Sequence, residues 1–543
     1  MNNAIFNVPL PKNEIVLNYA AQSNEKKQLK EKLSELKNKN IEIPAYIGDT
    51  EVKTGNMGEC RCPHDHKQLL ATYHQVGENE INMAIEAAMK ARKAWAAMPW
   101  EARAAIFLKA ADLLATKYRQ ILNAATMLSQ SKTAYEAEID SACELIDFWR
   151  FNTYYMQQIY SQQPQSSFGC WNAVVQRPLE GFIFAVTPFN FTSIAGNLPT
   201  SPALMGNVVL WKPASSAVYN SHFIMQLLKE AGLPDGVINL IPGRGSTIGN
   251  LVLTNPHLAG IHFTGSTAVF QGMWKTVGEN IANYYTYPRI VGETGGKDFV
   301  FVHSSANVDQ LKTGLIRGAF GYQGQKCSAA SRAYIPESVW SKIKDDLIDE
   351  IKKMKVGDPE DFRNFMCAVI DRSSFNTIKD YIDYARDSED AEIVVGGTYD
   401  DSKGYFVQPT IIRTSNPHFK LMEEEIFGPV LTVYIYPDSD YARTLELCDN
   451  TSPYGLTGAI FANDRSAIVL ATEILDHAAG NFYINDKPTG AVVGQQPFGG
   501  SRASGTNDKA GSMINLQRWI SPRTIKENFI PPAEYKLPHM DEK

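Results

Sequence analysis

The alternation of short apolar runs with helical stretches is the feature that most restricts the fold of this 543-residue chain. From Gly181 onward, apolar runs of a few residues are separated by segments with helical spacing. Strands and helices in alternation predict right-handed crossovers and a mostly parallel sheet with helices on both faces. The predicted strands of this first block are residues 181–186, 207–211, 236–241, 260–263 and 299–303.

A second block of the same alternation begins near Cys327. Its predicted strands include residues 391–396, 430–435 and 458–461. The chain is longer than one hydrophobic core usually organises. We therefore predict an α/β protein with more than one unit, in which ligands bind at the carboxyl ends of the strands.

The two ends of the chain have other patterns. Residues 23–39, with three leucines at helical spacing among lysines and glutamates, predict a surface helix. Residues 78–133 predict long helices with a break at Pro99. Residues 519–526 are predicted to be extended and able to add a strand to a partner subunit.

Composition and charge narrow the class of protein. A net charge of −7, with 44% hydrophobic and 20% charged residues, is typical of a soluble globular protein and disfavours nucleic-acid binding. The longest apolar runs are too short to cross a bilayer. Seven cysteines suggest no disulfide framework, and the N-terminus has no targeting pattern, so we expect a cytosolic protein.

Cys327 is the strongest candidate for a catalytic residue. It lies in the segment GYQGQKCS, residues 321–328, with Lys326 beside it. We expect this segment to begin a helix, and both a helix start and a neighbouring cation favour the thiolate. A free cysteine is more often a small buried side chain, so its assignment as a nucleophile depends on partners elsewhere in the chain.

Candidate partners follow the predicted strands. Asn190, in residues 187–191, can donate a hydrogen bond to a developing oxyanion, or it is a turn residue beside Pro188. Lys212 follows the next strand and can bind ribose hydroxyls, or it is a solvated surface lysine.

Glycine-containing loops follow further strands. In residues 263–267, backbone N–H groups and the Ser266 hydroxyl can meet a pyrophosphate, or Ser266 caps a helix. Glu293, at the start of the segment ETGGK, can act as a general base on water, or it lies in a surface turn. Residues 243–249 lack the spacing of the dinucleotide fingerprint and predict a tight turn into a helix.

Taken together, these segments resemble the aldehyde dehydrogenase superfamily over nearly the whole chain. The resemblance implies an α/β fold with two doubly wound domains and a β-flap for oligomerisation. The matching motifs, in the order and approximate spacing of the family, are residues 187–191, 211–213, 263–266, 293–297, 324–328 and 424–429.

The resemblance also implies a mechanism and an NAD site. Cys327 attacks the aldehyde, Asn190 and the Cys327 N–H hold the oxyanion, and Glu293 activates the water that hydrolyses the thioester. The cofactor-binding residues that it implies are Thr187, Lys212 and Glu425 for the riboses and nearby groups, Gly265 and Ser266 for the pyrophosphate, and Phe427 beside the nicotinamide.

Residues 480–487 and 493–506 resemble the branch of the superfamily that oxidises L-glutamate γ-semialdehyde, formed from 1-pyrroline-5-carboxylate, to L-glutamate in proline catabolism. This likeness places the substrate carboxylate at the backbone N–H groups of residues 489–491 and the aliphatic stem between aromatic rings. The implied substrate-binding residues are Ser328, Gly490, Ala491, Phe191 and Phe498.

Two positions depart from common family forms. Ala491 is serine in some relatives, so one hydroxyl donor is absent and we expect modest weakening of carboxylate binding. Ser215 stands where many relatives have a glutamate that repels a 2′-phosphate. We therefore expect NAD to be preferred and NADP to be tolerated.

The resemblance also implies domain boundaries and partners. We expect a homodimer or a larger homo-oligomer, a small-molecule substrate, and a functional link to a separate proline dehydrogenase, with no nucleic-acid or membrane partner. The implied parts are an NAD-binding domain (residues 1–157 and 180–295), a catalytic domain (296–512) and an oligomerisation flap and tail (158–179 and 513–543).

Some alternatives stay open at this point. The chain could act on another small semialdehyde, such as succinate semialdehyde, with NAD or NADP, or be a catalytically silent NAD-binding relative. The spacing of cysteines and histidines in residues 60–66 is not a usual zinc pattern, so we expect no metal. Glu144 lies either near the catalytic pocket or on an exposed helix face.

Overall fold

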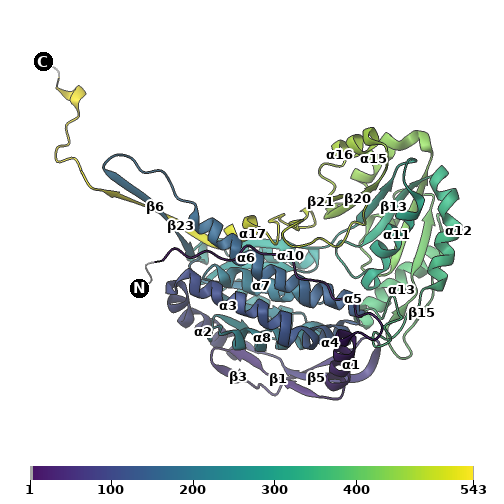
Figure 1. The fold of residues 1–543 in the computed structure, drawn as a ribbon, viewed down its shortest axis with the longest axis horizontal. Helices are drawn as coiled ribbons and strands as arrows, with labels where there is room; N and C mark the ends of the chain where they lie inside the picture. The colour runs from purple at the N-terminus through teal and green to yellow at the C-terminus, as the bar shows by residue number, and fades with distance from the viewer. Residues whose placement is uncertain (1–3, 542–543) are drawn as a thin grey trace.

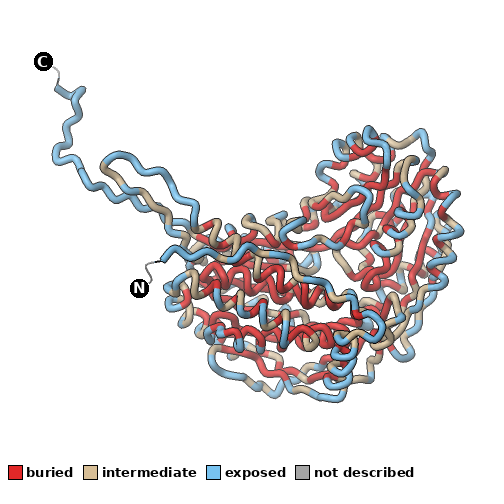
Figure 2. The backbone as a smooth tube through the Cα atoms, viewed as in Figure 1, coloured by how far each residue is buried: buried red, intermediate tan, exposed pale blue. Residues whose placement is uncertain are grey.

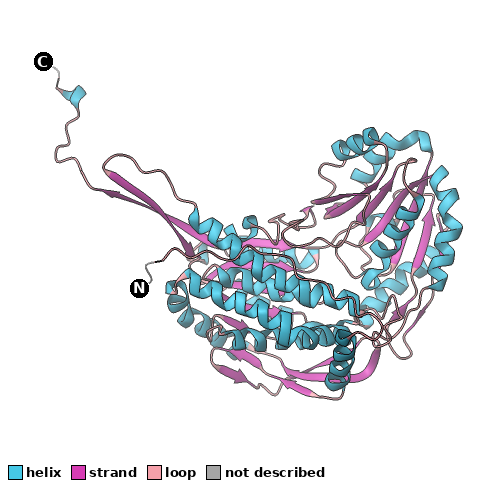
Figure 3. Cartoon of the chain, viewed as in Figure 1, coloured by secondary structure: helices cyan, strands magenta, loops and turns pink. Residues whose placement is uncertain are grey.

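Two main sheets, each flanked by helices, organise residues 4–541, the part of the chain that the computed structural model describes (Figure 3). The first sheet has the strand order β11-β10-β7-β8-β9-β2-β3. Strands β7 to β11 run parallel, and β2 and β3 extend the sheet with antiparallel pairing. The bounds are β2 Ala45–Ile47, β3 Thr50–Val52, β7 Phe182–Thr187, β8 Val208–Pro213, β9 Ile238–Leu240, β10 Leu258–Thr264 and β11 Arg289–Glu293.

The second sheet has the strand order β14-β17-β18-β13-β12-β20-β21. It is parallel except for the edge strand β14, which pairs antiparallel with β17. The bounds are β12 Asp298–Val302, β13 Ala330–Pro336, β14 Ala391–Val395, β17 Thr410–Thr414, β18 Val430–Tyr436, β20 Thr457–Phe461 and β21 Asn481–Ile484.

The prediction of α/β units with mostly parallel sheets is confirmed, and every predicted strand of both blocks exists. The strand at residues 299–303 continued the first block in sequence, but β12 lies in the second sheet. Side chains of β12 alternate between two cores: Phe299 and Phe301 pack into one cluster, and Val300 and Val302 into the other. This period of two explains why the strand is apolar throughout, because helices cover both faces of the sheet.

The predicted helices are present. Helix α1, Asn24–Lys37, buries Leu29, Leu33 and Leu36 while its charged residues face solvent. Pro99 separates α2, Glu78–Ala97, from α3, Trp100–Leu113, because the residue before a proline favours an extended backbone. The other helices that surround the first sheet are α4 Arg119–Gln130, α5 Ala134–Ala137, a π-helical segment at Glu138–Glu144, α6 Leu145–Ser161, α7 Thr192–Leu204, α8 Val218–Ala231, α9 Gly245–Leu253 and α10 Thr267–Glu279.

The helices around the second sheet follow the same crossover pattern. Their bounds are α11 Val308–Phe320, α12 Glu337–Lys353, α13 Arg372–Arg386, α14 Lys420–Glu423, α15 Tyr441–Asn450 and α16 Arg465–Ile474, and a short α17 spans Met513–Gln517. No helix within residues 4–541 has the length and apolar character needed to cross a membrane.

A two-stranded antiparallel sheet, formed by β6 and β23, projects from the body with the C-terminal segment (Figure 1). Strand β23, Ile520–Asn528, pairs antiparallel with β6, Cys170–Pro178, of the same chain. The predicted strand at residues 519–526 therefore exists and pairs with β6 along one edge. Its addition to a partner subunit stays a prediction. Most of this two-stranded sheet is solvent-exposed (Figure 2), and its role in oligomerisation stays a prediction.

The remaining strands are short or lie outside the two main sheets. They are β1 Ile41–Ile43, β4 Met57–Cys62, β5 Asp65–His74, β15 Tyr399–Asp400, β16 Phe406–Val407, β19 Tyr454–Gly455 and β22 Ser501–Arg502.

Packing of α1 supplies a first test. Leu33 is 1% exposed, so Leu33→Ala should lower the free energy of unfolding by about 2–5 kcal/mol, through lost burial and a cavity. Leu10 is 72% exposed, so the matched variant Leu10→Ala should stay within about 0.5 kcal/mol of the wild type. Urea unfolding curves of the three proteins check this. Equal midpoints for the two variants would contradict the packing of α1.

Candidate active site

Cys327 lies in a tight turn between the short helical segment Gly321–Gly324 and strand β13. Tyr322 and Gln323 adopt left-handed backbone angles, with φ of 50° and 54°, which is costly for residues with a side chain. Hydrogen bonds compensate for this strain. The Gln323 amide donates to the carbonyls of Ser131 and Ala368 at 2.9 and 2.8 Å, and the Gln325 side chain accepts from the N–H of Ile370 at 2.9 Å.

The predicted helix start and thiolate at Cys327 are wrong for this structure. Helix α11 ends at Phe320, before the turn, and the chain continues into a strand. The Lys326 ammonium does not stabilise a Cys327 thiolate, because it forms an ion pair with Glu136 at 2.8 Å. Burial raises the pKa of the Cys327 thiol well above its usual value, and the carboxylates of Asp298, Glu425 and Glu293 raise it further. The resting thiol is therefore protonated at neutral pH, and attack on an aldehyde requires a proton acceptor.

Glu293, the last residue of β11, is one of the carboxylates that act on Cys327. Its Oε2 accepts a hydrogen bond from the N–H of Gly500 at 2.9 Å. Burial raises the pKa of Glu293 well above its usual value, and the Gly500 bond opposes that shift only in part. A carboxylate in this state is a stronger base, once ionised, than a solvated glutamate.

The loop that follows Glu293 brings Glu425 and Cys327 together. Glu425 Oε1 accepts from the N–H of Gly296 at 2.9 Å. A Cβ on Gly295 would lie 2.3 Å from Glu425 Oε2, and a Cβ on Gly296 would lie 2.2 Å from the Cys327 carbonyl oxygen. Position 296 therefore requires glycine, because a Cβ would collide with the backbone, and a Cβ on Gly295 would displace the Glu425 carboxylate. Burial raises the pKa of Glu425 to about 7.

Asn190 reaches the same turn from the first sheet. Its side chain is 4% exposed, and its Nδ2 donates to the carbonyl of Gln325 at 3.0 Å. The amide nitrogen carries two hydrogens, so one stays available for an oxygen near Cys327. The predicted oxyanion donor therefore lies against the turn that carries the predicted nucleophile.

Four of the predicted cofactor residues, Thr187, Lys212, Gly265 and Ser266, lie at the carboxyl ends of the parallel strands β7, β8 and β10. Thr187 ends β7, and its hydroxyl accepts from Trp211 Nε1 at 3.0 Å. Lys212, on β8, has a lowered pKa because it is buried, and its Nζ would lie 3.9 Å from a Cβ on Gly245. Residues 243–249 form the predicted turn into α9, yet they lie beside Lys212, a proximity that their spacing did not indicate.

Gly265 and Ser266 lead into α10. Ser266 occupies the N-cap position, but its side chain makes no capping hydrogen bond. The alternative in which Ser266 is only a helix cap is therefore weakened, and its hydroxyl is available for a ligand. Open N–H groups at a helix start suit a phosphate.

Phe427 connects the two halves of the site. It follows α14 in the second unit, and its backbone has φ of 57°. Its ring packs edge-on against Phe189, in the loop after β7, with the ring centroids 5.8 Å apart. The predicted nicotinamide neighbour therefore lies where the loops of both sheets meet.

The predicted substrate residues divide into a polar and an aromatic group. The Ser328 hydroxyl donates to Thr489 Oγ1 at 2.8 Å, so the loop that carries Gly490 and Ala491 lies beside the catalytic turn. Phe191 occupies the N-cap position of α7, and the Lys132 ammonium lies 4.2 Å from its ring centroid. Phe498 is held by two backbone hydrogen bonds with Ala510, of 3.0 and 2.7 Å.

A buried polar group near the start of α7 was not predicted. Asp140 accepts from the N–H groups of Thr192 and Ser193, each at 2.9 Å, and from the Lys132 ammonium at 2.7 Å. Glu144 accepts from the Ser193 hydroxyl at 3.0 Å, and burial raises the pKa of Glu144 to about 8. Glu144 is therefore not on an exposed helix face. Asp140 and Glu144 lie about fifty residues from their partners on α7, a distance at which sequence periodicity carries no signal.

The segment 60–66 contributes one member of a polar cluster. The ligand atoms of His64, Asp358 and Glu360 lie within 4.8 Å of one another, and His64 is 1% exposed. Glu360 already forms an ion pair with Lys37, which neutralises one of the carboxylates. The expected absence of a metal stays a prediction.

Comparisons with known proteins agree on one family. The family model described as "Aldehyde dehydrogenase family" matches residues 50–525. The chain is 55% identical over 537 residues to "Delta-1-pyrroline-5-carboxylate dehydrogenase, mitochondrial" of Dictyostelium discoideum. The aligned region covers 98% of this chain and 96% of that protein. It is 49% identical over 529 residues to the human protein of the same name, covering 97% and 94%.

Among solved structures, the fold matches the "Delta-pyrroline-5-carboxylate dehydrogenase from Mycobacterium tuberculosis bound with NAD". The TM-score is 0.97 and the sequence identity 51%, with all of both chains covered. The expected fold of two α/β domains is thereby confirmed.

The carboxylates around Cys327 supply a second test. An ionised Glu293 opposes formation of the thiolate, so Glu293→Gln should lower the pKa of the Cys327 thiol. Inactivation by iodoacetamide, measured as a function of pH, should then have its midpoint at a lower pH than in the wild type. Glu423→Gln, two residues before Glu425 at a half-buried glutamate that pairs with His418, should leave the midpoint unchanged. A midpoint that Glu293→Gln leaves in place would refute the assigned influence of Glu293.

Proposed function

Because the chain belongs to the aldehyde dehydrogenase family, we propose that it oxidises L-glutamate γ-semialdehyde, formed from 1-pyrroline-5-carboxylate, to L-glutamate with NAD. The observation that carries this proposal is the meeting of Cys327, Glu293 and Glu425 around a single glycine-rich loop, in a chain about half identical to proteins of that name. The reaction is the second step of proline catabolism.

The residues at the strand ends fit NAD. Ser266 begins α10 without a capping bond, Lys212 lies on β8 of the same sheet, and Glu425 of the second unit lies against Gly296, just after β11. Gly265 and Ser266 would hold the pyrophosphate, Thr187, Lys212 and Glu425 the riboses and their surroundings, and Phe427 would border the nicotinamide. NAD, when bound, supplies the acceptor for the hydride. With Ser215 in place of glutamate, NADP is tolerated less well than NAD but not rejected.

Cys327 is the nucleophile. Ionised Glu293 takes the proton of the thiol and passes it to solvent, and the thiolate attacks the aldehyde carbon. The new oxyanion is held by the Asn190 amide and the Cys327 N–H. Loss of hydride from the tetrahedral carbon leaves a thioester on the sulfur. Ionised Glu293 then takes a proton from water, the hydroxide attacks the thioester, and L-glutamate and the thiol are released.

Substrate selection rests on the loop beside the catalytic turn. The backbone N–H groups of Gly490 and Ala491 bind the α-carboxylate, and the Ser328 hydroxyl assists when it turns its hydrogen from Thr489 to the carboxylate. Phe191 and Phe498 enclose the aliphatic stem. Because Ala491 lacks the hydroxyl of a serine, carboxylate binding is modestly weaker than in relatives with serine.

The proposed parts of the chain follow from these roles. Residues 1–157 and 180–295 bind NAD, residues 296–512 carry the nucleophile, and residues 158–179 and 513–543 associate subunits into a homodimer or a larger assembly. A functional link to a separate proline dehydrogenase stays a prediction. So does the cytosolic location, since the relatives from Dictyostelium discoideum and human are named mitochondrial.

The nucleophile can be tested by substitution. Cys327→Ala should reduce NADH formation from pyrroline-5-carboxylate by at least about a thousandfold, because no covalent intermediate can form. Cys170→Ala, on the projecting strand β6, should retain wild-type activity. Steady-state absorbance at 340 nm measures both. Appreciable turnover by Cys327→Ala would remove this mechanism, and an inactive wild type with every aldehyde would favour a silent NAD-binding relative.

Substrate choice is tested by comparing two semialdehydes. The wild type should have a kcat/KM for L-glutamate γ-semialdehyde at least about tenfold above that for succinate semialdehyde, because the pocket is shaped for the longer chain with its α-amino group. Initial rates of NADH formation over a range of each substrate give the ratio. A preference for succinate semialdehyde would replace the proposed substrate.

A further inference from the structure

An extended N-terminal segment, residues 7–19, runs across helix α6 and the π-helical segment before it (Figure 1). We call this segment the strap. The N–H of Val8 donates to Gln157 on α6 at 2.6 Å, and the N–H of Leu17 donates to Glu138 at 2.9 Å. The strap has no helix or strand of its own, so its position depends on these contacts.

Asn13, midway along the strap, uses its whole amide. Its Nδ2 donates to Asp147 Oδ2 on α6 at 2.8 Å and to the carbonyl of Val493 at 2.7 Å. Its Oδ1 accepts from Gln495 Nε2 at 2.9 Å. One side chain therefore joins the strap, α6 and the loop at residues 489–497.

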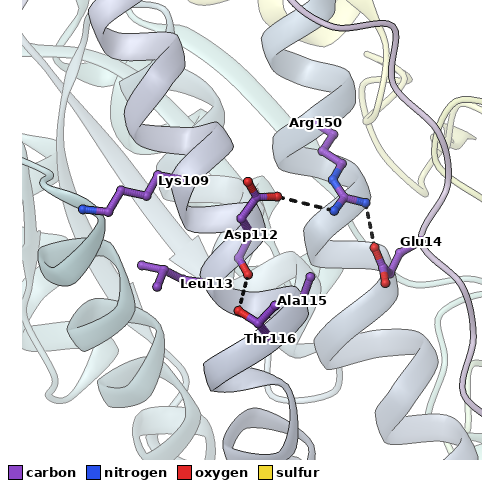
Figure 4. Close-up of a pocket in the computed structure, with 7 residues that line it drawn as sticks. All are labelled: Glu14, Lys109, Asp112, Leu113, Ala115, Thr116 and Arg150. Carbon is purple, nitrogen blue, oxygen red and sulfur yellow. Dashed lines mark hydrogen bonds and ion pairs between the residues drawn. The ribbon is translucent and has the colours of Figure 1, made fainter.

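The residue next to Asn13 fixes the strap in place. Glu14 accepts from Arg119 at 2.8 Å and from Arg150 at 2.7 Å, and its N–H donates to Asp147 Oδ1 at 2.8 Å. Figure 4 shows Glu14 paired with Arg150 from α6, at the edge of a surface pocket that contains none of the predicted site residues. Because Glu14 is held by two cations, Asn13 is presented to the loop from a fixed backbone.

The loop is also held at its two ends. At the C-terminal end, Asn481 Nδ2 donates to the Pro497 carbonyl at 3.1 Å. At the N-terminal end, Thr489 accepts a hydrogen bond from Ser328, and Gly490 and Ala491 follow without regular structure. On the other side of these two residues, Val493 and Gln495 bind Asn13. The strap therefore provides the hydrogen bonds that hold the loop closest to Gly490 and Ala491 on their C-terminal side.

We propose that the strap is a positioning element for substrate recognition, in which Asn13 holds the 489–497 loop so that the N–H groups of Gly490 and Ala491 stay directed at the α-carboxylate. This role rests on the proposed function, because it needs a substrate carboxylate bound at that loop. Asn13 does not touch the substrate. It acts through the loop, and its loss affects substrates that carry the carboxylate.

The test compares Asn13→Ala with Asn7→Ala. Asn7 lies on the same strap and accepts from Gln157 at 2.9 Å, so the control removes a strap contact with α6 that does not involve the loop. Asn13→Ala should raise KM for L-glutamate γ-semialdehyde roughly fivefold or more, the effect of about one hydrogen bond, with kcat within about twofold. With propanal, which has no carboxylate, kcat/KM should stay within about twofold. Asn7→Ala should match the wild type with both aldehydes.

Hydrogen–deuterium exchange gives a readout that does not depend on turnover. Amides of residues 490–496 should exchange faster in Asn13→Ala than in the wild type and in Asn7→Ala. Unchanged exchange, or equal losses with propanal and the semialdehyde, would overturn the positioning role. If the wild type fails to oxidise the semialdehyde, the proposed function fails. A slow-exchanging loop that is released by Asn13→Ala would then still support the link between strap and loop.

Discussion

The chain crosses from one sheet to the other between Glu293, at the end of β11, and Asp298, at the start of β12, and the candidate site is built around this short connection. Gly295 and Gly296 have no side chain, so the Glu425 carboxylate and the Cys327 carbonyl come within contact of the backbone. A Cβ at either position would separate these groups. The crossing therefore fixes the relative positions of the predicted base, the predicted nucleophile and a predicted cofactor ligand.

Close packing around this connection also determines protonation. Cys327, Glu293 and Glu425 all have raised pKa values because burial disfavours their charged forms. Burial likewise lowers the pKa of Lys297, which lies in the same loop, to about 7. The resting site therefore holds fewer charges than its residue types suggest, and charge develops there only as the reaction requires it.

Motif spacing was a good guide to the strands and to the residues at their ends. Lys212 and Ser266 were assigned from their positions after apolar runs, because parallel strands place their carboxyl ends at one edge. The same reasoning was wrong for Cys327, where glycines and small polar residues resembled a helix start. The left-handed Tyr322 and Gln323 that form the turn depend on side-chain bonds to residues far away in sequence.

The sequence by itself determined the α/β alternation, the motifs of the aldehyde dehydrogenase family and the identities of the candidate nucleophile, base and oxyanion donor. These features are local, since each depends on periodicity or on a few neighbouring residues. Only the tertiary structure decided the protonation of the Cys327 thiol, the burial of Glu144 beside Ser193 and the hydrogen bonds between Asn13 and the 489–497 loop. Each of these depends on desolvation or hydrogen bonds between segments that are distant in sequence, and spacing along a chain carries no record of such contacts.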